Sequence, residues 1–531
     1  MNNRKNKSGA TVGIDLGTRN ALCACVDRDG RPVMIPNRWG HVSTPSVVGW
    51  NGNWIVGEDA VRFSLRNSHS AWWDLKRKVG QDFRAFCGGK SRTAEEMLVP
   101  LLCSLREDAE VFLGQFVSSC VLAVPACFSL LQREALARAA KTAGMGEVRI
   151  VNEPTAAALA FGLEGRFLVL DFGAGTVDVS VAESENGVWQ ILESVGSSQI
   201  GGYDFDLALA EWLRERLRLG SPEADPSNPE TVCLEDACWR TLIMEAETIK
   251  IALSSCRSYR WTPPPLNGKR FSSLQIYRED LERMIRFSIK RLLHVVQRLW
   301  ERHSPERLLL VGGSSRIPLL RDIFEEEITR PERLSLCAEE SVAAGAALYA
   351  QAGKERLLLD VLSGDIGFLR DGKPEILIYA GSPLPCTAKA SFIPHQSEWT
   401  ELSVFQSIGG IRKERTILSS LKLNVTAGTR LELRCSLSMS GFLHCHVKHG
   451  TSEFDMPLFQ EHKSGGASAA SLPSQEIRKL KLRLAPLEIL LSPSQQDKLH
   501  LMVRQIESLE DDESSLEILE GIVKDLELAL S

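Results

Sequence analysis

The chain lacks the long apolar runs that place a protein in a membrane or on a secretory route. Although 44% of its 531 residues are hydrophobic, no stretch approaches the ~18 uncharged apolar residues of a membrane-spanning helix. The polar, basic segment Met1–Ser8 leads into a β-like run, not into the core of about 7–15 apolar residues that marks a secretory signal. The sequence therefore predicts a cytoplasmic protein with no membrane span.

The chain also lacks a cysteine framework and a strong excess of charge. Its 13 cysteines are odd in number and scattered, with no Cys-x-x-Cys pair, a pattern typical of reduced thiols. Sixty-two basic residues against 68 acidic ones give a net charge of -6. This balance provides no global attraction to nucleic acid or to an anionic membrane, so we expect no nucleic-acid partner.

Two related glycine turns are the most informative feature that is present. The phrase Gly13–Thr18 returns in altered form as Leu170–Asp178, and each follows an apolar run, Ala10–Ile14 or Phe167–Leu170. Each turn is thus predicted to be the tip of a β-hairpin. Glycine lets backbone N–H groups close on phosphate oxygens, and an aspartate at a strand end is suited to hold magnesium through water. The pair predicts duplicated halves that face one polyphosphate.

The pattern along the chain separates an α/β part from a later β part. Strands and helices alternate up to about Ala352, which is typical of an α/β domain. Beyond a short apolar island, alternating segments up to about residue 450 predict a β-sandwich, and the Gly/Ser/Ala run Ser464–Ser471 predicts a hinge before final helices. Specific expectations are helices at Glu95–Leu113, Leu130–Ala143 and Ala237–Leu253, and strands at Val117–Pro125, Leu402–Phe405, Leu421–Val425, Leu431–Leu437 and Leu443–Val447.

Further phrases carry a resemblance to a known family. Together with the two turns, the chain resembles the DnaK-type chaperones, the seventy-kilodalton heat-shock family, over nearly its whole length. The phrases Ile35–Asn37 and Leu105–Glu110 are most similar to the HscC branch of that family. The other matching phrases, in family order, are Leu75–Arg77, Val124–Phe128, Asn152–Ala158, Gly201–Asp206, Val311–Pro318 and the Leu-Leu-Leu-Asp segment Leu357–Asp360.

The resemblance implies an α/β, actin-like and ribonuclease-H-like duplicated ATPase domain, then a β-sandwich peptide-binding domain and a short α-helical lid. A lid of about sixty residues is shorter than in the long members of the family and implies faster client release. The expected regions are a polar tail at 1–9, the nucleotide-binding domain at 10–353, an apolar linker at 354–361, the sandwich at 362–463, a hinge at 464–473 and the lid at 474–531.

The resemblance also assigns ATP or ADP, magnesium and potassium as cofactors, and roles to single residues. Asp15 and Asp171 organise magnesium through water, and Lys76 reaches the γ-phosphate or the attacking water. Glu153 and Asp178 order water and magnesium opposite Lys76, so no covalent nucleophile is needed. A solvated surface lysine is the alternative for Lys76. Phosphate contacts fall to Gly17, Thr18, Arg19, Gly173, Ala174, Gly175, Thr176, Gly201 and Gly202.

The adenosine side of the cleft is implied at two places. Gly312, Gly313, Ser314 and Arg316 match one side, where the arginine stacks on the base. From the inserted helix, residues that match the ribose and adenine contacts are spaced for one helical face, so an exposed helical face is the alternative. These residues are Glu247, Lys250 and Ser254.

The remaining implied roles concern coupling and clients. ATP docks the linker Leu357–Asp360 and opens a peptide groove, hydrolysis reverses this, and Pro125 and Arg133 relay the signal. The partners are unfolded or specific client polypeptides, a J-domain co-chaperone and a nucleotide-exchange factor. Groove candidates, for which packing in the sandwich core is the alternative, are Phe368, Ile376, Ile378, Leu402 and Val404.

Three positions depart from the family pattern. Arg19 stands where a small residue is usual, and its cation can pair with phosphate or obstruct the turn. Ala174 replaces a glycine, which is harmless at negative φ and strained at positive φ. Ile251 replaces a basic residue that covers the adenine. We therefore expect weaker nucleotide binding.

Three functions are consistent with these observations. The first is an ATP-hydrolysing chaperone that binds extended apolar peptides. The second is a nucleotide-gated interaction module with little turnover, which the three departures favour and the retained Lys76, Glu153, Asp171 and Asp178 oppose. The third is a small-molecule kinase of the same fold class, which has no use for the linker and the β-domain.

Overall fold

The hinge, the lid and the first eight residues lie outside the part of the chain that the structure describes. The computed structural model of the chain describes residues 9–65, 67–185, 188–197, 200–217, 236–266, 269–332, 337–351, 357–359, 361–362, 364–370, 373–393, 398–408 and 414–456.

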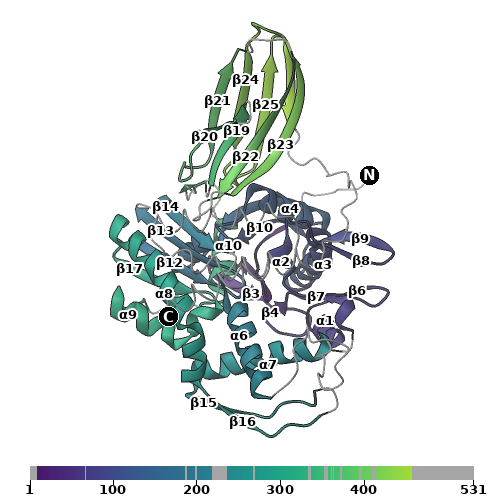
Figure 1. Cartoon of the computed structure of the whole chain (residues 1–531), viewed down its shortest axis with the longest axis vertical. Coiled ribbons are helices and arrows are strands. Elements are labelled where there is room, and N and C mark those ends of the chain that lie inside the picture. The colour runs from purple at the N-terminus through teal and green to yellow at the C-terminus, as the bar shows by residue number, and fades with distance from the viewer. Residues whose placement is uncertain are drawn as a thin grey trace, which may run out of the picture. The chain divides into compact units, whose positions relative to one another are not determined.

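Two mixed sheets in the α/β part share a core of four strands in the same order (Figure 1). In each sheet, the strand before a glycine turn pairs antiparallel with the strand after it and parallel with a later strand. The two predicted hairpins are therefore confirmed. The first sheet contains β1 (Ala10–Leu16), β2 (Asn20–Val26), β3 (Pro32–Ile35), β4 (Ser43–Pro45), β10 (Val117–Val124) and β11 (Glu147–Asn152), and the second contains β12 (Gly165–Phe172), β13 (Val177–Glu185), β14 (Val188–Ser197), β17 (Arg307–Val311) and β18 (Leu357–Leu359). The shared order is β10-β1-β2-β3 in the first sheet and β17-β12-β13-β14 in the second.

Helices α5 (Glu153–Phe161) and α10 (Ser341–Gln351) cross at very short range. A Cβ atom added to Gly345 would lie 1.6 Å from the carbonyl oxygen of Ala156. The same helix presses against β1, where a Cβ on Gly13 would lie 2.1 Å from the backbone nitrogen of Ala347. The backbones thus pack without intervening side chains, which fixes the strand ends that carry the glycine turns.

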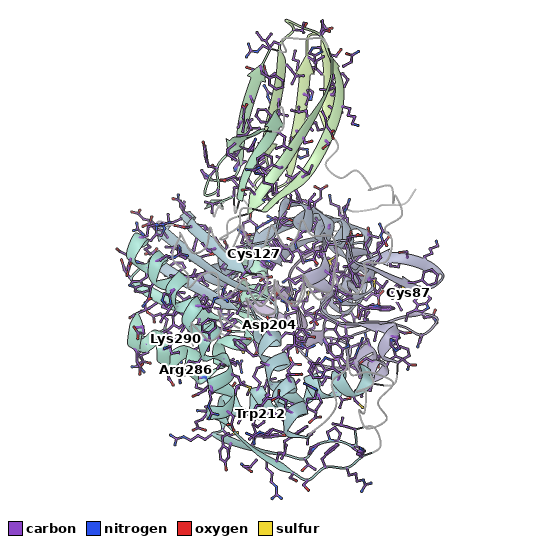
Figure 2. All side chains as sticks on the ribbon, viewed as in Figure 1. Cys87, Cys127, Asp204, Trp212, Arg286 and Lys290 are labelled. Carbon is purple, nitrogen blue, oxygen red and sulfur yellow. The ribbon has the colours of Figure 1, made fainter. Side chains whose placement is uncertain are left out.

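The long helix α8 (Arg278–His303) shows why these helices line the sheets. Its apolar positions Leu281, Ile285 and Ile289 are buried, whereas Arg286 and Lys290, labelled in Figure 2, are exposed. This spacing of three to four residues produces one apolar face that packs into the core. Further helices are α1 (Gly57–Ser64), α2 (Leu75–Lys78), α3 (Ala94–Leu113), α4 (Leu130–Thr142), α6 (Gly202–Arg216), α7 (Asp236–Ser255) and α9 (Pro318–Glu327).

The later part is a β-sandwich, as the alternating pattern predicts. Two four-stranded sheets share one core, in which Phe368 and Val404 from one sheet meet Leu433 and Val447 from the other. One sheet contains β19 (Gly364–Arg370), β20 (Lys373–Ile378), β22 (Glu398–Ile408) and β23 (Glu414–Val425), and the other contains β21 (Cys386–Phe392), β24 (Leu431–Leu437), β25 (Leu443–His449) and β26 (Ser452–Met456).

Small sheets and hairpins complete the α/β part. None of the described helices has the length and apolar character needed to cross a membrane. The small sheets comprise β5 (Val48–Trp50), β6 (Trp54–Val56) and β7 (Ala71–Trp72), the hairpin β8 (Arg84–Cys87) and β9 (Lys90–Thr93), and the hairpin β15 (Ser258–Trp261) and β16 (Leu274–Tyr277).

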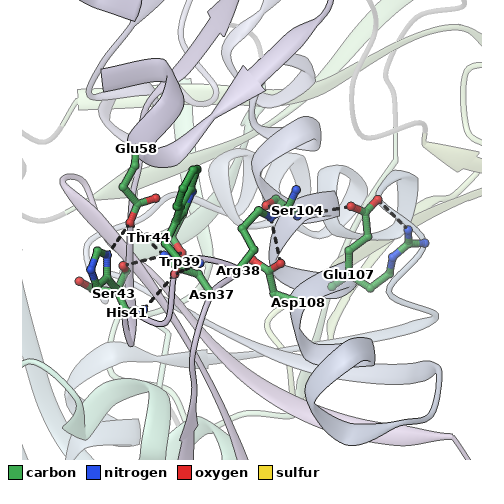
Figure 3. A network of polar contacts seen from close by, with 11 residues as sticks. Asn37, Arg38, Trp39, His41, Ser43, Thr44, Glu58, Ser104, Glu107 and Asp108 are labelled. Atoms are coloured by element: carbon green, nitrogen blue, oxygen red, sulfur yellow. Dashed lines mark hydrogen bonds and ion pairs between the residues drawn. The ribbon is translucent and has the colours of Figure 1, made fainter. Parts of the chain in front are cut away.

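The structure brings together the two phrases that resemble the HscC branch (Figure 3). The loop after β3 is closed by Asn37, whose side-chain oxygen accepts hydrogen bonds from the backbone N–H groups of Trp39 and His41. From the same loop, the Arg38 guanidinium reaches α3, where its Nε lies 3.1 Å from Asp108 Oδ1. The phrase Ile35–Asn37 is thereby tied to the phrase Leu105–Glu110.

Candidate functional site

The two glycine turns face each other at close range. Gly175, in the second turn, lies so near the first that an added Cβ would come 2.3 Å from the Thr18 hydroxyl oxygen. Each turn joins the strands of its own hairpin, β1 to β2 or β12 to β13. The predicted meeting of two phosphate-type turns is thus present in the structure, with space that only glycine leaves open.

Two further predicted segments hold the second turn in place. The backbone N–H of Gly202 donates to Gly173 O at 3.0 Å, and the Ser314 hydroxyl donates to the same oxygen at 2.9 Å. Gly312 has φ +79°, and a Cβ there would lie 2.6 Å from Asp171 Oδ1. Ala174 does not have a positive φ, because Asp74 and Ser304 are the only described non-glycine residues that do. The substitution at this turn is therefore unstrained.

A buried lysine stands among four carboxylates. Lys76, on α2, has only 3% of its side chain exposed, and its Nζ donates to Glu153 Oε1 at 2.5 Å. Asp15, Asp171 and Asp178 act on the same group electrostatically. The surface-lysine alternative is excluded by this burial.

The carboxylates carry more negative charge than Lys76 can balance. Burial, and then the charge of Glu153, raise the pKa of Asp15 and of Asp178 to about 7 each, and raise that of Asp171 well above its usual range. Asp178 Oδ1 accepts a hydrogen bond from the backbone N–H of Cys127 at 3.1 Å, while its buried Oδ2 has no partner. These oxygen groups fit a hard divalent cation such as magnesium, which supplies the missing positive charge.

Helix α7 contacts the segment Gly201–Asp206 through a buried ion pair. Lys250 Nζ lies 2.6 Å from Asp206 Oδ1 and donates to Gly202 O at 2.9 Å. Ser254, one turn later, donates within its own helix to Lys250 O. Lys250 is therefore a buried support of the glycine segment, and for this residue the exposed-face alternative is wrong.

Glu247, on the same helix, is engaged by Arg19. The Arg19 guanidinium reaches across 228 positions of sequence to Glu247, with Nη2 at 2.7 Å from Oε2 and Nε at 3.3 Å from Oε1. It also lies 5.0 Å from the ring centroid of Trp73 and 5.1 Å from that of Tyr203. Arg19 thus points away from the phosphate turn and does not obstruct it.

Some residues predicted to contact adenosine are more exposed than the residues of the glycine turns. Arg316 is half exposed and pairs with Glu339, with 3.3 Å between Nε and Oε1. Next to it, a Cβ on Gly313 would meet only the Glu339 side chain, at 3.4 Å. Ile251, which stands where the resemblance implies a basic residue over the base, is 62% exposed on the surface of α7. No cation at this position is therefore available for the expected contact with the base.

Pro125 and Arg133 lie in one hydrogen-bonded cluster next to the carboxylates. Arg133 is buried and donates to Ala126 O, to Phe128 O and, at 2.5 Å, to Asn152 Oδ1. Asn152 directly precedes Glu153. The loop that contains Pro125, also buried, is thereby braced between α4 and the lysine–carboxylate cluster.

The linker and α4 each connect to described neighbours. Residues Leu357–Leu359 form β18, which pairs parallel with β14 in register Val188 with Leu357. At the start of α4, the backbone N–H of Leu130 donates to Gln406 Oε1 of β22 at 2.8 Å. Asp360 lies outside the described residues. Of the predicted linker at 354–361, the segment Leu357–Leu359 is therefore an edge strand of the second sheet.

Most of the groove candidates are core residues of the sandwich. Phe368, Ile378, Leu402 and Val404 are at most 5% exposed and belong to one apolar cluster, while Ile376 is half-buried. Packing in the core was the alternative for these positions, and their burial agrees with it. Their lining of a peptide groove stays a prediction.

Several residues that shape the site have no role assigned from the sequence. Asp206 and Asn152 lie inside recognised phrases but were assigned nothing, and their roles depend on Lys250 and Arg133, which are far away in sequence. Trp73 lies two residues before the phrase Leu75–Arg77 and Tyr203 lies inside the phrase Gly201–Asp206, but only the fold shows that both rings lie beside Arg19. The sequence signal available for Asp206 was that this polar residue lies in the same phrase as Gly201 and Gly202.

Comparison with known proteins identifies similar sequences over most of the chain. The sequence model described as Hsp70 protein matches residues 11–87 and 84–398. "Chaperone protein DnaK" of Thermosipho africanus is 31% identical over 476 residues, covering 83% of this chain and 78% of the relative. The protein of the same name from Thermotoga neapolitana is 31% identical over 473 residues, with the same coverage of both chains. That of Thermosipho melanesiensis is 30% identical over 492 residues, or 86% and 81% of the two chains.

Proposed function

The chain belongs to the Hsp70 family, and from this premise we propose that it is an ATP-hydrolysing chaperone whose nucleotide state switches its affinity for extended apolar peptides. The observation that carries the proposal is the buried Lys76 among four carboxylates, directly beside two facing glycine turns. Such a site suits phosphoryl transfer to water, in which positioning and charge neutralisation supply most of the catalysis.

Magnesium fits the donor set. Asp15 and Asp171 are the residues that would hold it, through water, beside the phosphates. When bound, the ion neutralises charge on the phosphoryl oxygens and on the surrounding carboxylates. Burial, and then the neighbouring carboxylate of Glu153, raise the pKa values of Asp15 and Asp171, and Asp178 Oδ2 has no hydrogen-bond partner. A bound cation would offset the cost of burying these groups, which supports the assignment.

Lys76 and Glu153 divide the hydrolytic work between them. Burial disfavours the charge of Lys76, but Glu153 and Asp15 outweigh this and raise its pKa, so it stays protonated and can donate to a phosphate oxygen. Glu153 and Asp178 are acceptors that orient the attacking water. Thr18 and Thr176, in the two turns, complete the phosphate contacts with the backbone N–H groups of Gly17 and Gly175. The N–H of Gly173 closes its own turn instead, since it donates to Thr176 O at 3.0 Å. No residue needs to form a covalent bond.

The linker and the α4 contacts support coupling of the site to the sandwich. Arg133 joins the loop of Pro125 to Asn152, next to Glu153, and α4 begins at the contact with Gln406. A change at Glu153 therefore has a continuous hydrogen-bonded route toward α4. We propose that β18 and this route transmit the nucleotide state, with the domain boundaries 353/354 and 361/362 on either side of the linker.

Partners and location extend the proposal. Clients would be unfolded or specific polypeptides, helped by a J-domain co-chaperone and a nucleotide-exchange factor, in the cytoplasm. The twelve cysteines of the described part are free thiols, which agrees with a reducing compartment. Assignment to the HscC branch rests on the phrases Ile35–Asn37 and Leu105–Glu110.

A nucleotide-gated binder without turnover is the second candidate. The exposed Ile251 favours it, because loss of a base-covering cation weakens nucleotide binding. The unstrained Ala174 and the displaced Arg19 no longer favour it, since neither disturbs the phosphate turns. A small-molecule kinase has no use for a sandwich and an edge-strand linker, and no contact in the described residues favours it.

Hydrolysis in a single turnover separates the two candidates. Protein in excess over γ-labelled ATP with magnesium is expected to release phosphate, whereas Lys76→Ala should bind ATP and release phosphate about 100-fold more slowly. Lys78→Ala is the matched control, because Lys78 lies two residues on and does not pair with Glu153. Release that is equally slow in wild type and Lys76→Ala would favour the non-hydrolysing binder.

A further inference from the structure

Arg19 occupies an unusual position at the edge of the nucleotide cleft. It lies in the turn between β1 and β2, immediately after Thr18, yet only 7% of its side chain is exposed. The guanidinium uses two nitrogens on the two oxygens of Glu247 and lies about 5 Å from two aromatic rings, those of Trp73 and Tyr203. This planar, two-point geometry is one that arginine provides and lysine does not.

The charge of Arg19 is balanced by more than one carboxylate. Burial alone disfavours the cation, but Glu247, Asp74 and Asp206 together outweigh burial and raise its pKa. Asp74 belongs to the segment before α2, and Glu247 belongs to α7. The guanidinium therefore stays charged and held in the folded protein.

Other arginines cross between the same two parts of the chain. Arg77, on α2, lies 3.4 Å from Asp204 of α6, and Arg240, on α7, donates to the backbone oxygen of Ala71 at 3.1 Å. With Arg19, these contacts join the β1–β2 turn and residues 71–77 on one side to residues 203–247 on the other. We call Arg19, Arg77 and Arg240 the arginine bridge.

The bridge lies against both phosphate turns. On one side, Arg19 follows Thr18, whose hydroxyl abuts Gly175. On the other, Glu247 is one helical turn from Lys250, which supports Gly202 and through it the second turn. Separation of the two halves around a bound nucleotide would therefore require the Arg19–Glu247 pair to break and the guanidinium to leave the ring of Tyr203, while it stays beside Trp73 on its own side.

We propose that Arg19 is a positioning residue which, through Glu247, holds the two halves of the cleft together and thereby sets the rate at which ADP leaves. This inference rests on the proposed adenine-nucleotide site. A buried, hydrogen-bonded ion pair must be lost before the cleft opens, so the pair slows dissociation much more than association.

The test is the release of a fluorescent ADP analogue from the full chain, measured by stopped flow after a chase with unlabelled ADP and magnesium. Arg19→Thr is expected to release the analogue about 10- to 100-fold faster, with an association rate within about threefold of wild type. Arg19→Lys should be intermediate, since a single ammonium cannot match both oxygens of Glu247. Arg286→Thr, on the exposed face of α8, is the matched control and should release at the wild-type rate.

Glu247→Gln and an exchanged pair distinguish an electrostatic tie from simple loss of packing. Glu247→Gln should accelerate release in the same way as Arg19→Thr. The double variant Arg19→Glu with Glu247→Arg should release the analogue more slowly than Arg19→Glu alone, by a factor of about five or more. Packing damage would lower the thermal midpoint of every variant and would not be repaired by the exchange.

The outcomes test the inference about Arg19 and the proposed nucleotide site separately. Wild-type release rates in both Arg19→Thr and Glu247→Gln, with the analogue bound, would overturn the inference and leave the proposed function intact. If Arg19→Thr does not fold, Glu247→Gln and Arg19→Lys decide the question in the same assay. Failure of the wild-type chain to bind the analogue would overturn the nucleotide site and, with it, this inference.

Discussion

At the scale of single residues, charge balance determines the properties of the cleft. Lys76 faces Asp15, Glu153, Asp171 and Asp178, so the folded protein carries a local excess of negative charge. Lys250 plays a similar part for Asp206, but there the pair is one to one and closes on a glycine segment. A shortage of positive charge marks a place for a cation, whereas a balanced pair marks a structural support.

Asp206 gives a pH dependence with a definite sign. Burial raises its pKa from 3.8 to about 6, against the opposing effect of Lys250. The folded state therefore binds this proton more tightly than the unfolded state, and stability falls as the pH rises from about 4 to about 6. Over this pH range, the free energy of unfolding should fall by about 1–3 kcal/mol more in wild type than in Asp206→Asn. Urea unfolding followed by tryptophan fluorescence at pH 4.5 to 7 tests this, and parallel pH curves for the two proteins would contradict it.

Ile251 offers a test of the base side of the cleft. Ile251→Arg would return a cation to the position that covers the adenine in the family, and one cation–π contact at an exposed site should tighten ATP binding about two- to fivefold. Equilibrium titration with a fluorescent ATP analogue measures the change. Phe287→Arg, an exposed apolar residue of α8, is the control and should bind as wild type does. Equal affinity in Ile251→Arg would show that the base does not lie over this position.

At the scale of elements, close backbone contact fixes the crossing of α5 and α10. Helix α5 begins at Glu153, and α10 packs against β1, which carries Asp15. A crossing without side chains between the helices leaves no room for relative sliding. The positions of two cleft carboxylates thus depend on one glycine contact, at Gly345.

Gly345→Ala should be strongly destabilising. The new Cβ would lie 1.6 Å from Ala156 O, so the helices must move apart. We expect a loss of about 3 kcal/mol in the free energy of unfolding, above the gain in helix propensity of about 1 kcal/mol. Urea unfolding measures the loss, and Gln351→Ala, at the exposed end of α10, should change little. A stable Gly345→Ala protein with unchanged ATP affinity would refute this role of the crossing.

The elements that the sequence predicts best are those with a strong local signal. Helix α3 begins within one residue of the prediction, since Thr93 and Glu96 form a capping box before an apolar repeat. Strands β24 and β25 begin at the predicted residues, but β22 and β23 are longer than their apolar cores suggest, because edge residues pair without being apolar.

Contacts between distant elements could not be predicted in the same way. The sequence placed Arg19 in a phosphate turn, but its pairing with Glu247 depends on where α7 packs. The groove residues show the same limit, since alternation marks Phe368 and Val404 as inward-facing without distinguishing a core from a binding surface. Family phrases located the cleft because they record which distant segments meet.

At the scale of the whole molecule, the proposed chaperone function requires coupling between nucleotide binding and client binding. The described part supplies two contacts for this coupling, the parallel pairing of β18 with β14 and the hydrogen bond from Leu130 to Gln406. At its other end β14 pairs Gly196 with Asp178, and in the first turn of α4 Arg133 donates to Asn152, the residue before Glu153. A switch of this kind requires that the two nucleotide states differ in these contacts.

Leu358→Pro tests the linker strand. Proline cannot donate to a strand ladder, so it should disfavour the pairing of Leu358 with Trp189. We expect nucleotide binding within about twofold of wild type and loss of ATP-accelerated peptide release. Leu358→Val, which keeps the backbone donor, should behave as wild type. Undiminished acceleration in Leu358→Pro would show that the strand pairing is not part of the switch.

The most direct test of the central claim is the fluorescence anisotropy of a labelled extended apolar peptide on the purified chain. The peptide is bound with ADP, and Mg-ATP is then added to wild type and to Lys76→Ala. We predict release that is several-fold faster with ATP in both proteins, followed by rebinding in wild type alone as ATP is consumed. Peptide affinity that is the same with ADP and with Mg-ATP would contradict the account.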